Sequence, residues 1–331
     1  MDGITTHEGI QISQIYQLTR REKDFILYGY SISAILSILL NCISIITIPR
    51  VKDCFGENTK LCLMFLAVTD LVTGLLCSTS GVIFVYVPVT KGVADTIVVL
   101  CTAFVWQSMW ILTLASVDRY IAVTRPLQYH SIVTRKMMII ALTTVMILAL
   151  LNSGGSYLQS VLTGECHPFG NICLSLIKPS FIIYALIPLT ALIVTTYVNV
   201  RLVLISHSHA RQIAALEAAV NAGNIAPPPP RRAGMKGLKT VLVITCMFYL
   251  AWIPGTIVSF INPIPAITVP PVITLIMRYA ITSNSWWNAC VYFFMNKSYR
   301  RLVFKIIGSQ IRRFHCRSSI QVVPNTNPYE A

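Results

Sequence analysis

The residues of this chain that could do chemistry are a few charged and polar side chains inside, or at the ends of, long apolar runs. Asp118, Arg119 and Tyr120 stand together where one such run meets basic residues. Asp70 lies in the middle of another run. A charge in a membrane span is costly unless it has a partner or a function. These residues are therefore candidates for ion pairing, cation binding or contact with a partner.

The elements that must position these residues are predicted to be membrane helices. The chain has 331 residues, of which 55% are hydrophobic and only 11% are charged, and its mean hydropathy is +0.67. Soluble proteins carry roughly 25% charged residues. The formal charge is +14, but the basic residues lie in short segments between apolar runs. This placement favours membrane orientation and contact with anionic lipid over nucleic-acid binding.

Seven apolar runs are long enough to cross a bilayer, which requires roughly 20 residues. They cover residues 25–48, 61–87, 93–123, 137–161, 180–205, 238–261 and 272–294. Backbone groups in lipid must be satisfied within the segment, so the runs are predicted to be helices. The first run is too long for a signal peptide and is expected to be retained. The predicted fold is an all-α membrane protein, a seven-transmembrane helix bundle over residues 25–294.

The distribution of Lys and Arg predicts the orientation of the bundle. Connections on one side carry about three times as many basic residues as those on the other, and the richer side is expected to be cytosolic. Residues 1–24 are then extracellular and residues 295–331 are cytosolic, as expected for a plasma-membrane protein with several spans. Asp118 and Arg119 lie at the cytosolic end of the third span.

Two cytosolic segments have patterns of their own. The fifth helix could extend into the loop before Pro227–Pro230, a polyproline segment that favours a stiff spacer or, alternatively, a site for a proline-reading domain. In the tail, Tyr299, Leu302, Val303, Ile306 and Ile307 recur at three- and four-residue spacing. This spacing predicts a short amphipathic helix on the inner leaflet, in contact with lipid. Cys316 beyond it is a candidate for palmitoylation or an ordinary thiol.

The predicted spans carry an ordered set of motifs. These are Asn41 in the first run, Leu66-Ala67-Val68-Thr69-Asp70 in the second, Asp118-Arg119-Tyr120 and Pro126-Leu127 in the third, Pro188 in the fifth, Phe248 and Trp252-Ile253-Pro254 in the sixth, and Asn284-Ser285 with Asn288-Ala289-Cys290-Val291-Tyr292 in the seventh. The ordered set resembles the rhodopsin-like (class A) family of G-protein-coupled receptors. The resemblance implies a receptor that transmits binding of an extracellular ligand to a heterotrimeric G protein, with arrestin as a further partner.

The resemblance also implies roles for single residues. Arg119 would pair with Asp118 in the inactive state and contact the G protein in the active state. The switch residues would be Asp118, Arg119, Tyr120, Phe248, Trp252, Pro254, Asn288 and Tyr292. Many relatives carry an acid at the start of helix six, but this chain has Gly234 there, amid basic residues. We therefore expect a less firmly held inactive state and some basal signalling.

Asp70 needs partners within the membrane. The family resemblance implies an allosteric sodium site formed by Asp70, Ser108, Asn284 and Asn288, all of which are present. Oxygen ligands around one carboxylate suit a hard cation. The alternative is a purely structural hydrogen-bond cluster. No other cofactor is expected.

The outer cysteines depart from the family pattern. Ala94 stands where the family usually has the cysteine that ties helix three to the second outer loop. Cys166 and Cys173 both lie in that loop, and we expect a disulfide between them because the outer face is oxidising. A bond from one of them to Cys101 or Cys77, or free thiols, are the alternatives.

The residues expected to line the ligand pocket are mostly uncharged. They are Cys101, Val105, Ser180, Tyr184, Trp252, Ser259, Arg278 and Thr282. By resemblance, Cys101 stands where amine receptors carry an aspartate and Thr282 where opsins carry the retinal lysine. Both differences argue against these ligands and leave a small ligand or a short peptide. Arg278 could bind an anionic group or extend to the interface.

Two other classes of protein fit the sequence less well. A transporter or channel without G-protein coupling would need an ion path, but the spans offer one central acid and no repeat pairs the two halves. A membrane enzyme would need an intramembrane nucleophile pair or a His and Asp cluster, and the six histidines all lie outside the predicted spans. A non-enzymatic receptor is the favoured interpretation.

Overall fold

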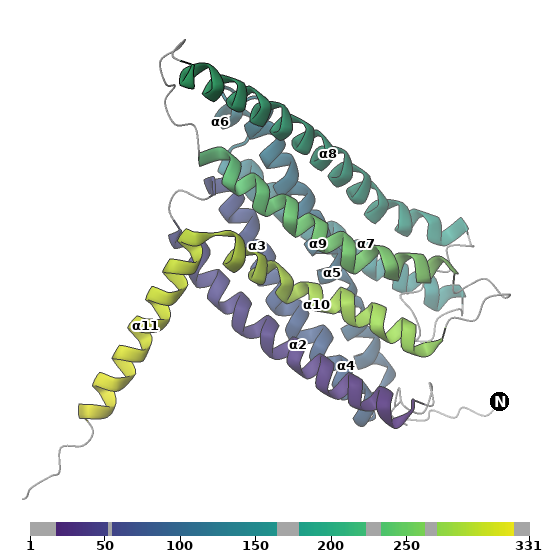
Figure 1. Cartoon of the computed structure of the whole chain (residues 1–331). Coiled ribbons are helices and arrows are strands. Elements are labelled where there is room, and N and C mark those ends of the chain that lie inside the picture. Colours follow the sequence, from purple (N-terminus) through teal and green to yellow (C-terminus); the bar gives the residue numbers. More distant parts are fainter. Residues whose placement is uncertain (1–17, 52–54, 164–178, 223–232, 262–269, 321–331) are drawn as a thin grey trace, which may run out of the picture.

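The structure is a computed structural model that describes residues 18–51, 55–163, 179–222, 233–261 and 270–320. Seven long helical segments lie side by side in one bundle (Figure 1). They are α2 (Arg20–Thr47), the continuous segment α3–η2–α4 (Glu57–Thr73, Gly74–Ser78, Thr79–Tyr86), α5 (Lys91–Thr124), α7 (Arg135–Thr163), α8 (Pro179–Asn221), α9 (Ala233–Ile261) and α10 (Pro271–Met295). The predicted seven-helix bundle is confirmed.

Five of the described helices are long and apolar enough to cross a membrane by length and composition: Arg20–Arg50, Glu57–Tyr86, Gly92–Thr124, Arg135–Gly155 and Leu189–Ser208. The helix α9 contributes a shorter apolar stretch, Lys239–Gly255. In α10, Asn284, Ser285 and Asn288 are buried polar residues. Helix α10 therefore has a polar face inside the bundle, and this face lowers its hydropathy.

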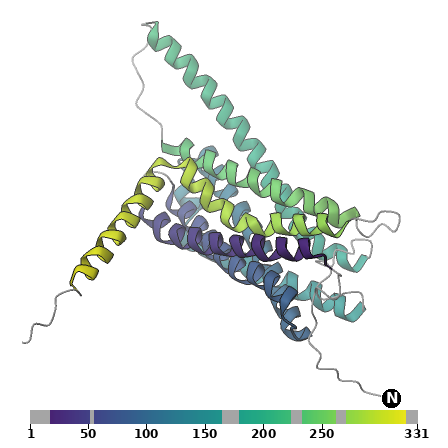
Figure 2. The same cartoon turned by 60° about the horizontal axis from the view of Figure 1, so that its bottom comes forward.

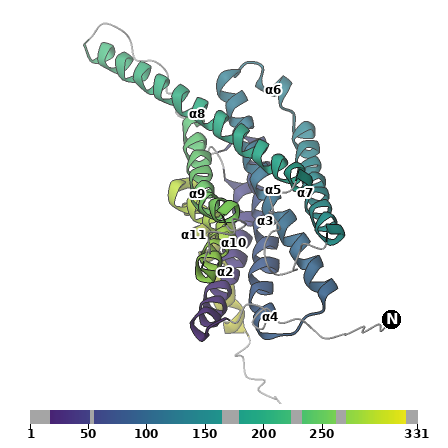
Figure 3. The same ribbon diagram turned by 90° about the vertical axis from the view of Figure 1, so that its right-hand side faces the viewer.

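Helix α5 occupies the centre of the bundle and packs against α3, α7, α8 and α9 (Figure 3). Its buried residues Ile111 and Leu112 belong to the main core, together with Leu66, Phe248 and Tyr292 of other helices. Neighbouring residues on one helix face different directions, so a central helix must offer apolar and polar side chains to several neighbours at once. This explains why α5 contributes to every polar cluster described below.

The first helix begins at Arg20, before the apolar run that starts at Phe25. The reason is a capping box: Thr19 accepts a hydrogen bond from the backbone of Glu22, and the Glu22 carboxylate accepts one from the backbone of Thr19 at 2.7 Å. Such reciprocal bonds satisfy amide groups that a helix start leaves open. A polar signal therefore extends this helix beyond its hydrophobic part.

The second span contains a π-helical turn at Gly74–Ser78, between α3 and α4. Ser37 of α2 donates a hydrogen bond to the carbonyl of Asp70, one turn before this segment, at 2.9 Å. A Cβ on Gly74 would collide with the Ser37 side chain. The glycine therefore allows α2 to approach the second span closely beside Asp70.

Two helices extend beyond the bundle (Figure 2). Helix α8 continues to Asn221, so the predicted extension of the fifth helix is confirmed. After α10, helix α11 (Lys297–Ile320) leaves the bundle at an angle. Tyr299 and Val303 of α11 are buried in the main core, while Phe304 is exposed, so one face of this helix docks on the bundle.

Candidate functional site

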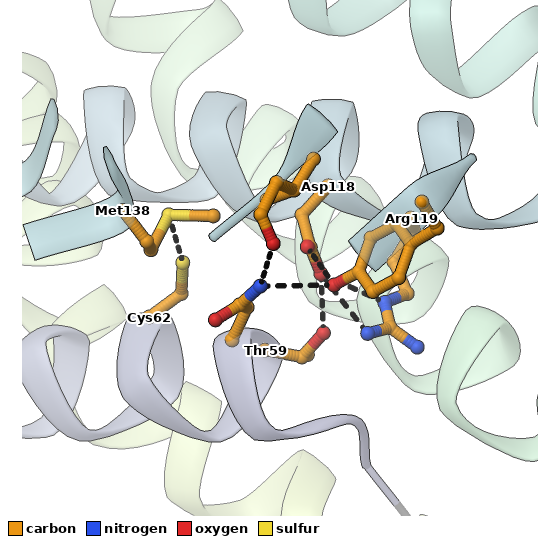
Figure 4. A network of polar contacts seen from close by, with 8 residues as sticks. Thr59, Cys62, Asp118, Arg119 and Met138 are labelled. Atoms are coloured by element: carbon orange, nitrogen blue, oxygen red, sulfur yellow. Dashed lines mark hydrogen bonds and ion pairs between the residues drawn. The ribbon is translucent and has the colours of Figure 1, made fainter. Parts of the chain in front are cut away.

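Asp118 lies near the end of α5 and is almost fully buried, with 1% of its surface exposed. Its carboxylate accepts hydrogen bonds from Arg119, through Nη2 at 2.9 Å and Nε at 3.2 Å. The same carboxylate accepts a bond from Thr59 Oγ1 of α3 at 2.5 Å (Figure 4). The pairing of Asp118 with Arg119 that the sequence suggested is therefore present, and a second helix supports it.

Tyr129 donates a further hydrogen bond to the Asp118 carboxylate. It lies on the short helix α6 (Tyr129–Ile132), in the connection between α5 and α7, and its hydroxyl donates to Asp118 Oδ1 at 2.5 Å. Asn58 of α3 donates to the Tyr129 hydroxyl at 3.3 Å and to the carbonyl of Val133 at 2.9 Å. We call this set of side chains the Asp118 network; its members are Asn58, Thr59, Asp118, Arg119 and Tyr129. The end of the bundle that contains them is called the Arg119 end.

The electrostatics of the Asp118 network favour a neutral phenol at Tyr129. Burial raises the pKa of Tyr129 to about 12, and its hydrogen bond to Asp118 adds to this effect. Tyr129 is therefore protonated at all physiological pH values and remains a donor. A buried carboxylate is stabilised by such donors and by an adjacent cation.

The sequence did not point to three members of the Asp118 network. Asn58 and Thr59 lie just before the second apolar run, and Tyr129 lies in a short connection. Tyr120, which the sequence grouped with Asp118 and Arg119, packs instead against Val198 and Leu202 of α8. Adjacent helical residues point in different directions, so the tripeptide is divided between two surroundings.

Asp70 is the centre of a second buried polar cluster, which also includes Ser108 and Asn288. Ser108 Oγ donates to Asp70 Oδ1 at 3.1 Å, and Asn288 Nδ2 donates to Asp70 Oδ2 at 2.8 Å. Asn41, another potential partner, instead donates to the carbonyls of Ser37 and Ser285, each at 2.9 Å. The helices α3, α5 and α10 thus meet at one carboxylate.

The residues around Asp70 fit a bound cation. The side-chain oxygens of Asn284 and Asn288 are buried and have no hydrogen-bond partner among the described residues. A carboxylate, a hydroxyl and amide oxygens are the donor set of a hard cation. Buried polar oxygens without partners are costly, and a cation would satisfy them. Asp70, Ser108 and Asn288 offer such a donor set, and Asn284 lies one turn before Asn288 on α10. We propose these four as the residues that would hold sodium.

Trp252 of α9 lies in an aromatic stack that links α9 with α5. Its ring is 5.3 Å from that of Phe248, stacked at 25°, and 5.3 Å from that of Trp106, tilted at 41°. Trp106 lies outside the motifs that the sequence shares with the family. Pro254 lies inside α9, where it removes a backbone hydrogen bond. The stack and the proline together make this part of α9 a candidate hinge.

Tyr292 lies between the Asp70 cluster and helix α11. Its hydroxyl is buried and has no hydrogen-bond partner among the described residues. Its ring centroid is 6.1 Å from that of Tyr299. A buried hydroxyl without a hydrogen-bond partner is unfavourable, so a change of position that supplies a partner would stabilise Tyr292.

Only part of the predicted pocket can be followed. Cys101 and Val105 of α5 are half-buried, and the Cys101 thiol contacts Cys77 and Ser80 of the second span. Thr282 Oγ1 donates to the carbonyl of Arg278 at 3.0 Å, and Arg278 interacts electrostatically with Tyr30 of α2. The side chains of Ser180, Tyr184 and Ser259 lie outside the described region, although their backbones belong to α8 and α9.

The predicted covalent modifications lie outside the described part as well. Cys166 and Cys173 belong to residues 164–178, and nothing of the Cys316 side chain is described. Cys77 and Cys101, the alternative partners of the loop cysteines, are free thiols in the structure.

The end of the bundle opposite Arg119 contains an acid that the sequence did not single out. Asp95 of α5 is buried, and Tyr157 of α7 donates to its Oδ2 at 2.6 Å. Asp95 Oδ1 has no hydrogen-bond partner among the described residues. The signal was an acid placed two residues inside the third apolar run.

Comparisons with known proteins agree with this geometry. A family described as "7 transmembrane receptor (rhodopsin family)" matches residues 40–292. The chain is similar to 5-hydroxytryptamine receptor 4 of Cavia porcellus, with 25% identity over 92% of this chain and 84% of that protein. It is similar to trace amine-associated receptor 6 of Pan troglodytes, with 26% identity over 63% of each chain. It is also similar to a Gq-coupled rhodopsin of Mizuhopecten yessoensis, with 23% identity over 59% of this chain and 41% of that protein. The family match covers the Asp118 network, the Asp70 cluster and the aromatic stack around Trp252, and the chain belongs to the rhodopsin family of seven-transmembrane G-protein-coupled receptors.

Proposed function

We propose that this receptor signals by releasing Arg119 from the Asp118 network, so that Arg119 contacts a heterotrimeric G protein. The observation that carries this proposal is the burial of Arg119 against Asp118, which has donors from α3 and α6 as well. A buried arginine in this arrangement is withheld from a partner. A ligand that favours a state without these bonds would shift the population toward the coupled form. In this proposal the N-terminus is extracellular, the Arg119 end faces the cytosol of a plasma-membrane receptor, and arrestin shares that face.

We propose some basal activity for this receptor. Arg119 has Asp118 as its acidic partner among the described side chains. At the same end, α9 is joined to the end of α10 by a bond from Asn296 Nδ2 to Thr240 Oγ1 at 3.3 Å. A neutral bond at this distance is weaker than an ion pair with hydrogen bonds. The resting position of α9 is therefore restrained less firmly than by an acid on α9 itself.

We propose that the ligand is a small molecule or a short peptide that binds in the outer half of the bundle, above Trp252. Cys101, in contact with Cys77 and Ser80, offers no charge at the depth where relatives hold an amine. The names of two relatives indicate amine ligands for those proteins. An ion pair with an amine at Cys101 is not proposed for this chain. Lipids are expected to contact α11, which leaves the bundle at an angle and exposes Phe304 and Ile307.

The test is nucleotide exchange on purified G proteins of several subtypes, catalysed by the full chain in lipid nanodiscs. We expect exchange above that of empty nanodiscs with at least one subtype, and its loss in Arg119→Ala. Exchange no higher than with empty nanodiscs for every subtype would contradict basal activity. A ligand screen with the same readout would then be needed, and a ligand response that survives Arg119→Ala would contradict the proposed role of Arg119.

A further inference from the structure

Gly56 is the N-cap residue of α3, and its backbone does not require glycine. Its φ of −66° and ψ of 157° lie in the extended region that any residue adopts. N-cap positions favour Ser, Thr, Asp and Asn, whose side chains accept a hydrogen bond from the first turn, and they accept Gly more readily than Ala. Here no side-chain cap bond exists. Gly56 is thus an acceptable N-cap, but it lacks the capping side chain that its backbone conformation would allow.

The space beside Gly56 explains the absence of a side chain. A Cβ built on Gly56 would lie 2.8 Å from Arg119 Nη2, and 3.8 Å from both Cζ and Nη1. Contacts of a Cβ below 3.0 Å are essentially never observed in proteins. The neighbour is the far end of a long side chain, so the guanidinium, and not the backbone, would move.

The Nη2 atom that faces Gly56 is the same atom that donates to Asp118 at 2.9 Å. Moving it away from Gly56 therefore disturbs the bond that holds Arg119. Arg119 is buried, and Thr59 and Tyr129 occupy the other sides of the Asp118 carboxylate. An arginine displaced from Gly56 would have to keep or re-form its bonds with a carboxylate whose two oxygens already accept from Thr59 and Tyr129.

We infer that Gly56 is a positioning residue for Arg119: the missing side chain leaves the space in which the guanidinium rests on Asp118. The first connection of the chain, between the first and second spans, thereby sets how firmly Arg119 is withheld. This inference depends on the proposed function only for its effect on signalling. The position of the Arg119 guanidinium beside Gly56 is a property of the packing and does not depend on the proposed function.

Thermal melting of the purified, ligand-free Gly56→Ala receptor tests whether Gly56 positions Arg119. We expect a fall of about 2–4 °C in the melting temperature, the size of a shift for one disturbed side chain in a large domain. The same substitution in an Arg119→Ala background should give a smaller fall, because the colliding group is gone and only the poorer N-cap propensity of Ala remains. Arg119→Gln serves as a second shortened background if Arg119→Ala is poorly folded.

Gly154→Ala in α7 is the matched control, because its new methyl group would meet no atom within 4 Å. It should not lower the melting temperature in either background. An equal fall for Gly56→Ala with and without Arg119, or no fall in the parent chain, would overturn the inference.

Basal nucleotide exchange distinguishes the packing role of Gly56 from the role of the Asp118 network in signalling. If the Asp118 network is the resting restraint, Gly56→Ala should raise basal exchange about two- to tenfold, as expected for one side chain forced from its rotamer. If the melting temperatures change as predicted but basal exchange does not, Gly56 positions Arg119, and the proposed function of the Asp118 network is contradicted.

Discussion

Tyr129 donates a 2.5 Å hydrogen bond to Asp118 from a different helix, and it thereby joins the connection between α5 and α7 to the buried ion pair. The residue lies outside the apolar runs, and its side chain is half-buried. The bond couples the conformation of an exposed connection to the position of Arg119. A partner protein that displaces α6 would at the same time remove one of the donors that stabilise Asp118.

Tyr129→Phe should destabilise the resting state and raise basal nucleotide exchange. A hydrogen bond to a charged group contributes about 1.5–3 kcal/mol, and the half-buried position favours the lower end. The measurement is melting of the purified receptor together with exchange on a G protein. Phe keeps the ring, so Tyr129→Phe with the melting temperature and exchange of the parent would show that the hydroxyl has no role.

The pH dependence of this contribution follows from the pKa of Tyr129, which burial raises from 10.0 to about 12. The folded chain retains the phenolic proton more firmly than the unfolded chain does. The contribution of Tyr129 is then fully present below about pH 10 and is lost between about pH 10 and about pH 12. The stability difference between the parent and Tyr129→Phe should therefore be constant from about pH 6 to about pH 9. A difference that changes within this range would mean that another group controls the bond.

Asp70→Asn should abolish stabilisation by sodium. In the parent receptor, replacing choline chloride by sodium chloride at equal ionic strength should raise the melting temperature, because the oxygens of Asp70, Ser108, Asn284 and Asn288 gain a cation. Asn284→Ala should weaken the response without removing the carboxylate. A sodium response of the same size in Asp70→Asn would leave the cluster with a structural role only.

Tyr299→Phe should loosen the attachment of α11 to the bundle. The Tyr299 hydroxyl and Ser44 Oγ of α2 lie 3.0 Å apart and share a hydrogen bond. The ring would stay buried, so the expected loss is only that of the bond, about 0.5–1.5 kcal/mol. Hydrogen exchange should be faster in residues 297–309. Ser44→Ala alone and the double variant complete a cycle, and additive effects would show that the two groups do not interact.

Tyr157→Phe should destabilise the end of the bundle opposite Arg119 more than the combined variant with Asp95→Asn does. The single change leaves the buried Asp95 carboxylate without the 2.6 Å bond from Tyr157. An unsatisfied buried group costs about 1–3 kcal/mol, and more when it is charged. Asp95→Asn removes the charge, so adding it to Tyr157→Phe should restore part of the melting temperature. Greater destabilisation by the pair than by Tyr157→Phe would contradict this account.

Much of the fold was readable from local patterns. The helices α3–η2–α4, α5, α7 and α10 begin and end within a few residues of the apolar runs, because the requirement for internal backbone hydrogen bonds makes each long run a helix. The early start of α2 depended on Thr19 and Glu22, which the hydropathy pattern ignores. The cost of unpaired polar groups in the membrane indicated that Asp118, Arg119 and Asp70 need partners. The pairing of Arg119 with Asp118, and the grouping of Asp70 with Ser108 and Asn288, were implied by the family resemblance.

Seven helices, and the buried charges that need partners, could be predicted from the sequence, because both depend on the composition of short segments. The full set of partners depends on the tertiary structure. Thr59 and Tyr129 reach Asp118 from separate elements, Tyr120 turns away to α8, and Gly56 lies against Arg119. Such contacts depend on how distant helices rotate and approach one another. The periodicity of a single helix contains no information about the side chains that its neighbours present.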